Sequence, residues 1–298
     1  MRGYEQYQRF FLNRLDAYQD SLLFQITNPG WGNVFYMVVG LITLYFVLEY
    51  IFPWKKDQLK WRRGVTLDIF YTAFNYILFW FLLGYAICDV TAIVFRDFLS
   101  VVWGVTDLSM SNVGSLPKWL QLVLLFVIMD FFTYWGHILL HKVPFLWKIH
   151  KVHHCSSELD VFNSAKGHII ENLFYPFILY IPLAIVGFNV SDTFIISFVT
   201  YLFAFFTHCN IKLPLGLAKY VFNNPEFHIW HHDAEVRGKD GVNFGNALSI
   251  WDFFFGTAYL PEDRDGSEIR LGFHNSEEYP QGFISQQLQP FKEFFRKD

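Results

Sequence analysis

The chain has 298 residues, of which 53% are hydrophobic, 21% are aromatic and only 17% are charged. A formal net charge of −4 argues against a nucleic-acid partner, and three cysteines without a C-x-x-C pair give no disulfide framework. The mean hydropathy of +0.24 and several long apolar runs instead predict an integral membrane protein. We expect an all-α fold, a bundle of about four to five transmembrane or re-entrant helices with a cytoplasmic, histidine-rich, metal-binding cap.

Residues 1–33 mix charged and aromatic side chains, which predicts an interfacial amphipathic helix broken near Pro29. The first apolar run, residues 34–53, is long enough to cross a bilayer. The linker that follows holds one acidic residue and five basic ones, namely Lys55, Lys56, Lys60, Arg62 and Arg63. By the positive-inside rule this linker is cytoplasmic, where it could bind anionic lipid or an acidic protein.

The second apolar run covers about residues 67–90, and residues 91–118 are expected to form the loop on the opposite side. The third run, about residues 117–141, carries Asp130 and should return to the cytoplasm. Two marginal runs, about residues 169–188 and 193–207, then predict a helical hairpin that dips into or crosses the bilayer.

No spanning run follows residue 208, so the remainder is expected to form a cytoplasmic cap. We divide the chain into an N-terminal interfacial segment (1–33), a first transmembrane hairpin and loop (34–118), a histidine-rich catalytic domain (119–260) and a C-terminal tail (261–298). This division places every histidine pair or triplet described next on one side of the membrane.

Eight of the 11 histidines lie in three short boxes, namely His137 and His141; His150, His153 and His154; and His228, His231 and His232. Residues three and four apart share one face of a helix, so each box should present its rings together. Neutral imidazole is a good ligand for iron, copper, nickel and zinc. Because eight histidines exceed what one ion needs, the boxes predict two metal ions.

A histidine ligand usually donates its second ring N–H to a carboxylate or a carbonyl oxygen. Asp130 lies seven residues before His137, on the same helix face, and a buried carboxylate in a membrane helix needs a partner. Candidates for similar support are Asp160, Glu171, Asn210, Asp233, Asn243 and Asp252. Of these, we expect Asp130, Glu171, Asn210 and Asp252 to act at the catalytic site.

The pattern H-x3-H, H-x2-H-H and H-x2-H-H resembles the fatty acid hydroxylase / sterol desaturase superfamily of membrane di-iron enzymes. The flanks agree too, with D-x3-Y-W-x-H from Asp130, LWKIHKVHH from Leu146, HCNIKLP from His208 and NFGNALSIWDFFFGT from Asn243. The resemblance covers about residues 120–260. The chain departs from it at Ile138, where many members have a basic residue, and at Lys166-Gly167-His168-Ile169-Ile170-Glu171, where many read R-x-H-P-x-E. His168 and His208 join the eight box histidines as expected ligands.

The resemblance implies two iron ions, O2 as co-substrate and oxidation of a lipid C–H bond to an alcohol or an alkene, with zinc as a substitute metal. The sequence shows no flavin, haem or Rossmann signature, so electrons should come from a separate cytochrome b5-like or ferredoxin-like protein. Two other readings stay open. The boxes would also suit a zinc-dependent membrane hydrolase or isomerase, although H-E-x-x-H is absent. A metal transporter or sensor is disfavoured because its ligands should lie near the bilayer midplane.

Overall fold

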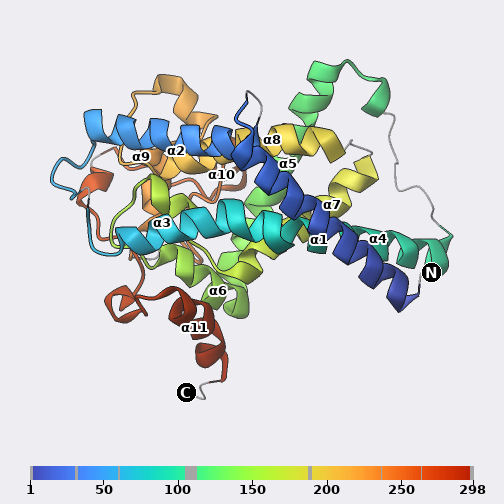
Figure 1. Ribbon diagram of the computed structural model, residues 1–298. Coiled ribbons are helices and arrows are strands. Elements are labelled where there is room, and N and C mark those ends of the chain that lie inside the picture. Colours follow the sequence, from blue (N-terminus) through green and yellow to red (C-terminus); the bar gives the residue numbers. More distant parts are fainter. Residues whose placement is uncertain are drawn as a thin grey trace.

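The structure, a computed structural model, describes residues 3–30, 33–59, 61–104, 113–186, 190–235, 237–262 and 264–295, without the side chains of residues 180–195. Within these ranges the regular secondary structure is helical, apart from two isolated antiparallel bridges, which confirms the expected all-α class. The α-helices (Figure 1) are α1 (Tyr4–Thr27), α2 (Val34–Ile51), α3 (Val65–Ala73), α4 (Tyr85–Trp103), α5 (Lys118–Lys142), α6 (Pro144–His154), α7 (Ile169–Val186), α8 (Val190–His208), α9 (Pro225–His228), α10 (Ile250–Phe255) and α11 (Phe283–Phe295).

Three helical segments are long and apolar enough to cross a membrane, namely Val34–Ile51, Val65–Trp103 and Lys118–Lys142. The second segment joins α3 to α4 through two π-helical turns, η1 (Phe74–Leu78) and η2 (Trp80–Gly84). The helix runs on past the boundary near residue 90 that the sequence predicted, so that boundary was wrong. It ends where Gly104 adopts a left-handed conformation with φ 67°. The apolar runs therefore predicted correctly that this part of the chain contains a span, but they did not predict where the span ends.

The N-terminal segment forms α1, which lies along α4 (Figure 1). Polar contacts fix this pairing, since Tyr18 donates to Asp89 at 2.9 Å and Arg14 approaches the same carboxylate at 3.0 Å. Tyr7 also donates to Asp97 at 2.9 Å, further along α4. The predicted helix is present, and its polar side chains at these positions contact α4.

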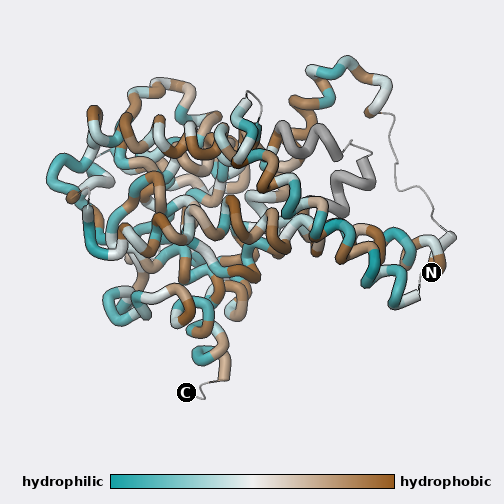
Figure 2. The backbone as a smooth tube through the Cα atoms, in the orientation of Figure 1, coloured by the Kyte–Doolittle hydropathy of each residue, from teal (hydrophilic) through white to brown (hydrophobic). Residues whose placement is uncertain are grey.

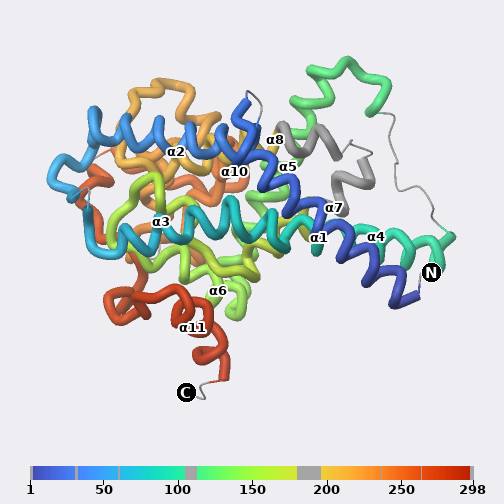
Figure 3. The backbone as a smooth tube through the Cα atoms, in the orientation of Figure 1, coloured from blue at the N-terminus to red at the C-terminus, as the bar shows by residue number. Residues whose placement is uncertain are grey.

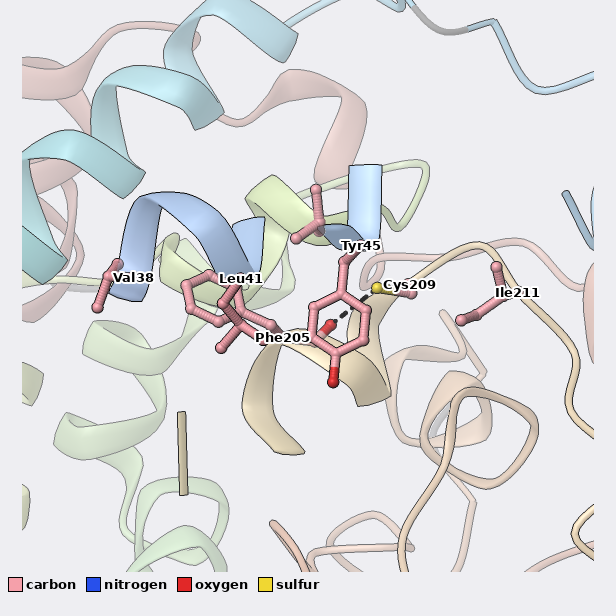
Figure 4. Close-up of a cluster of buried hydrophobic side chains, with 7 residues drawn as sticks. Val38, Leu41, Tyr45, Phe205, Cys209 and Ile211 are labelled. Atoms are coloured by element: carbon pink, nitrogen blue, oxygen red, sulfur yellow. Dashed lines mark hydrogen bonds between the residues drawn. The ribbon is translucent and has the colours of Figure 1, made fainter. Parts of the chain in front are cut away.

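One hydrophobic cluster joins α2 to the end of α8 (Figure 4). Val38, Leu41 and Tyr45 of α2 pack there against Phe205 of α8 and Cys209. The Tyr45 hydroxyl also donates to the carbonyl of Leu202 at 3.1 Å. This packing fixes His208, the last residue of α8, beside the linker that follows α2. Of the turn expected at residues 189–192, residue 189 lies outside the described residues, and residues 190–192 already belong to α8, so the turn was wrong there.

The cap packs against one end of the bundle, and α11 closes it on the side of α6 (Figure 3). Glu293 of α11 holds α6 through a 3.0 Å ion pair with Lys151, and its carbonyl accepts from Lys148 at 2.7 Å. Hydrophobic residues mark much of α2 and the α3–α4 segment, whereas the linker after α2 is largely hydrophilic (Figure 2). The cap thus covers the ends of the helices that carry the histidine boxes.

Candidate metal centre

Nine histidine side chains from α5, α6, α8 and the third box converge in two neighbouring groups. Within each group one ring nitrogen per residue lies within 4.8 Å of all the others. The first cluster comprises His137, His141, His150, His154 and His231. The second cluster comprises His153, His208, His228 and His232. The two clusters adjoin, because the rings of His154 and His232 are 4.5 Å apart between centroids.

The boxes do not map one to one onto the clusters. His150 and His154, one helical turn apart on α6, enter the first cluster, while His153 between them turns to the second. In the third box His228 and His232 enter the second cluster and His231 turns to the first. The expectation that each box faces one way is confirmed for His137 and His141 but was wrong for the other two boxes, because i and i+4 point about 40° apart and the i+3 residue lies on their other flank.

The hydrogen bonds made by Nδ1, on the side of a ring away from the cluster, fix the tautomer of that ring and so decide whether its Nε2 carries a hydrogen. Four Nδ1 atoms face main-chain carbonyls, from His137 to Phe244 at 2.9 Å, His153 to Lys166 at 2.9 Å, His208 to Ala204 at 2.8 Å and His231 to Val242 at 2.8 Å. A carbonyl can only accept, so Nδ1 carries the hydrogen in each of these rings. In a neutral ring the Nε2 atom is then a bare lone pair pointing into a cluster.

These lone pairs meet one another. The Nε2 atoms of His153 and His208 are 3.1 Å apart, and those of His137 and His150 are 3.2 Å apart. Neither nitrogen of the His153–His208 pair has a hydrogen to share, so their approach is repulsive unless a cation lies between the rings. Ligands at about 2.1 Å from a metal ion are separated by about 3.0 Å at right angles and about 3.4 Å in a tetrahedron.

Burial keeps the rings neutral and ready to coordinate. Loss of water lowers the pKa of His153 to about 4 and holds the pKa values of His150, His154 and His228 well below the usual range. The Nε2 atoms of His141 and His231 are buried without any hydrogen-bond partner. Such orphaned acceptors are costly, and their convergence in a histidine cluster fits a cation.

Two carboxylates shape the loop that supports the first cluster. Asp130 accepts from the main-chain N–H groups of Ala247 and Leu248, at 2.9 and 3.1 Å, and from Trp251 Nε1 at 2.9 Å. Asp252 accepts from the N–H groups of Phe244 and Gly245, at 2.7 and 2.8 Å.

Because the Phe244 carbonyl in turn holds His137, these acids act on the cluster through the loop and contact none of its rings. The loop is tight at Gly245, where an added Cβ would lie 2.5 Å from the carbonyl oxygen of Leu248. Asn243 beside it adopts φ 57° and bonds the main chain of Phe227 and Tyr259. Removing either acid should therefore loosen the loop before it disturbs the rings.

Glu171, at the start of α7, is the one predicted acid that touches a cluster histidine. Its Oε1 lies 3.0 Å from His150 Nδ1, while its Oε2 is buried and has no partner. The contact orients His150 in the same way that the carbonyls orient the other rings.

A buried network of four charges lies behind the second cluster. Lys166 pairs with Asp68 at 2.8 Å, Asp68 with Arg62 at 2.7 Å, and Arg62 with Asp160 at 2.7 Å. All four side chains are buried, and Asn163 bridges the middle of the network. The carbonyl of Lys166 is the acceptor for His153, so the network fixes that ring through the main chain.

Sequence reasoning missed this network. Arg62 appeared as one of the exposed basic residues of the linker, yet it is buried and paired. The main-chain carbonyls that accept from the rings were also missed. Every residue has such a carbonyl, so residue type does not indicate which ones bond a histidine. Asp160 was expected to support a ring, and Asp68 at the edge of an apolar run was the other available clue.

Four other predicted residues lie away from the rings. His168 belongs to neither cluster, because its Nε2 faces the carbonyl of Gln287 at 2.8 Å and its Nδ1 accepts from the N–H of Ile170 at 3.1 Å. Asn210 fixes both main-chain polar groups of Lys55. Asp160 belongs to the charge network, and Asp233 pairs with Arg237 at 2.7 Å.

Comparison with known proteins supplies independent evidence. The family model described as fatty acid hydroxylase matches residues 122–257, the region that holds both clusters. The ornithine lipid hydroxylase OlsE of Rhizobium tropici is 30% identical over 275 residues, which cover 90% of this chain and 78% of that protein.

Other relatives match over shorter regions. The alkylglycerol monooxygenase of Danio rerio is 33% identical over 139 residues, 47% of this chain and 30% of that protein. Methylsterol monooxygenase 2-2 of Arabidopsis thaliana is 28% identical over 156 residues, 50% of this chain and 58% of that protein. The chain thus spans much less than the full length of these two relatives, and no solved structure matches it. These names do not favour the hydrolase, isomerase or transporter readings.

Proposed function

Because this chain belongs to the fatty acid hydroxylase / sterol desaturase superfamily, we propose that it is a membrane-bound, O2-dependent lipid hydroxylase with a di-iron centre. The observation that carries the metal centre is the 3.1 Å approach of two Nε2 lone pairs from His153 and His208. Five histidines would hold one ion in the first cluster and four would hold the other in the second. His168 is left out of this ligand set because hydrogen bonds occupy both of its nitrogens.

Iron is the metal that suits both the ligands and the relatives. Imidazole binds iron and zinc alike, but zinc has no redox chemistry, and the relatives' names are hydroxylase and monooxygenase. When bound, an iron pair would supply O2 activation and the oxidation of an unactivated C–H bond. Zinc would occupy the same rings without supporting that reaction.

The protein's own residues would orient the ligand rings and keep water out of the site. Main-chain carbonyls and Glu171 fix which nitrogen of five cluster rings faces the metal, so these ligands need little reorganisation. The cluster rings are nearly all buried, which excludes water from the place where the oxidant would form. Electrons would come from a separate donor protein.

The substrate we propose is a membrane lipid with a polar headgroup. The three relatives described above are named for ornithine lipid, alkylglycerol and methylsterol. Ornithine lipid is the first candidate, since that relative is matched along most of its length. Hydroxylation is favoured over desaturation because these names are hydroxylases and monooxygenases.

The test is a reaction of purified protein loaded with Fe(II), supplied with a chemical reductant, 18O-labelled O2 and each of the three lipids in turn. We expect a lipid product that has gained one labelled oxygen atom, detected by mass spectrometry. Matched controls are His153→Ala, protein loaded with zinc and a reaction without O2. A product that forms with zinc in the absence of O2, or that carries no label, would overturn the proposal.

A further inference from the structure

Two short stretches of the cap expose apolar side chains, and we call them together the apolar patch. The first is residues 213–222, which include the 3-10 turn η5 (Gly216–Tyr220), and the second is α10. Leu217 is 83% exposed and Phe254 is 77% exposed. Other exposed members are Leu213, Val221, Phe222 and Ile250. The two stretches adjoin, because the rings of Tyr220 and Phe253 are 5.1 Å apart between centroids. Contiguous exposed apolar surface of this kind marks a site of contact with a membrane or another protein.

The patch carries no carboxylate on its outer surface. Residues 213–222 contain one charged side chain, Lys219, whose ammonium lies 5.4 Å from the centre of the Tyr220 ring. The single acid of α10, Asp252, is fully buried and accepts from the loop N–H groups. A lysine beside an aromatic ring at the edge of an apolar surface is typical of a membrane boundary, where the ammonium reaches water or lipid phosphate.

The patch continues the outer surface of membrane helices. Trp251 packs against Phe131 of α5 with ring centroids 5.2 Å apart, and Phe255 packs against Trp135 at 5.1 Å. Trp135 is itself exposed on α5, which is one of the three candidate spans. On the other flank Phe222 stacks on Phe203 of α8 at 6.0 Å. The α10 part of the patch therefore packs on α5 along residues 131–135, just before the first histidine box.

Several main-chain N–H groups of the patch are bonded internally, as contact with hydrocarbon requires. Loops with unpaired N–H groups are excluded from lipid, because no water is there to bond them. In residues 213–222 the N–H groups of Leu215, Ala218, Val221 and Phe222 all donate to carbonyls within the same segment. This segment projects at the upper left of Figure 3, above α2.

We propose that the apolar patch is immersed among the acyl chains of the leaflet nearest the histidine clusters. The cap is then partly a membrane-inserted structure, and the second cluster lies directly behind it. His208 shortly precedes the first stretch and His228 follows it closely, and both belong to that cluster. We favour lipid over a second copy of the chain or a soluble partner because the patch packs against the exposed aromatic face of α5, a candidate span.

The test uses a bimane fluorophore attached to Leu217→Cys or Phe254→Cys in lipid nanodiscs. The three native cysteines are buried or half-buried, and the unsubstituted protein treated in the same way gives the background. The matched control is Glu277→Cys, an exposed position on the cap. Quenching by doxyl groups on lipid chains is expected to be severalfold stronger at Leu217 and Phe254 than at Glu277, and quenching by aqueous iodide severalfold weaker.

Two other outcomes would overturn the inference. Iodide quenching equal to that of the Glu277 position would mean that the patch faces water. Protection from both quenchers would mean that a protein covers it. The metal content of each labelled variant, which should equal that of the unsubstituted protein, confirms that the clusters and the cap remain folded. None of these readouts depends on catalytic activity, so the inference can fail while the proposed reaction stands.

Discussion

Four of the nine cluster rings bond the main chain through one nitrogen and leave the other for a ligand. The four Nδ1 atoms bonded to main-chain carbonyls belong to His137, His153, His208 and His231, which come from four different elements. The same device thus occurs once on each of these elements. Bonded carbonyls also make the rings better electron donors to a metal.

Single ring deletions should separate the two clusters. We expect His153→Ala and His231→Ala each to abolish product and to lower the bound metal from about two ions to about one per chain or less, because each removes a ligand from a different cluster. Metal content by mass spectrometry is the measurement. His274→Ala, at an exposed position outside both clusters, is the control and should keep full metal. Full metal in either cluster variant would contradict the ligand assignment.

Acid should destabilise the metal-free protein. Burial lowers the pKa of His153 to about 4 and the pKa of His228 well below its ordinary value of 6.5. Such rings are neutral when folded and take up protons on unfolding, so stability present above pH 6.5 is lost as pH falls. The loss is about 1.4 kcal/mol per pH unit for each ring until its folded pKa is reached. The thermal midpoint of metal-free protein should fall between pH 8 and 5.5. A flat midpoint would show that the rings are not buried.

At the scale of elements, helix geometry explains why the boxes interleave. Pairs at i and i+4 stay together, as in His137 with His141 and His150 with His154, while the residue at i+3 crosses to the neighbouring cluster. The third box does the same although it is formed by α9 and a 3-10 turn, η6 (Ile229–His232). Two boxes that each reach both clusters tie the two sites into one unit.

The buried charge network links α3 to the segment before α7, and breaking it should be costly. Lys166→Met leaves Asp68 with Arg62 as its one remaining cationic partner, and loss of one member of a buried pair costs roughly 3–5 kcal/mol. The thermal midpoint in detergent should drop, and the second cluster should lose metal as the carbonyl behind His153 moves. Lys212→Met removes a half-exposed pair with Glu226 and should cost about 0–1 kcal/mol. Equal effects of the two substitutions would contradict a positioning role for the network.

The whole molecule has its histidine clusters at one end of the bundle, beside the basic linker. We therefore expect Lys56→Cys and Glu277→Cys to react with an impermeant maleimide from the cytoplasmic side, and Gly114→Cys from the other side. A Cβ added at Gly114 would meet no other atom within 4 Å, so cysteine fits there without a clash. Intact cells and inverted vesicles supply the two measurements. Labelling of Lys56 and Glu277 from opposite sides would contradict the topology.

The fold class followed from composition, because apolar runs of spanning length have few alternatives to membrane helices. The end of the second span did not follow, since hydropathy changes gradually and Gly104 rather than a polar break stops the helix. The sequence also missed the apolar patch. Its two stretches are short and separate in the chain, so neither resembles a span, and they become one surface where Tyr220 packs against Phe253.

The amino-acid sequence by itself determined that this is a helical membrane protein, which histidines form boxes, and which family the boxes resemble. Those features depend on residue type and on spacing along one element. The tertiary structure alone decided that the boxes interleave, that His208 enters a cluster while His168 does not, and that Arg62 and Lys166 are buried behind the site. These facts depend on how separate helices pack, because two side chains distant in the chain meet only when the elements between them have fixed their positions.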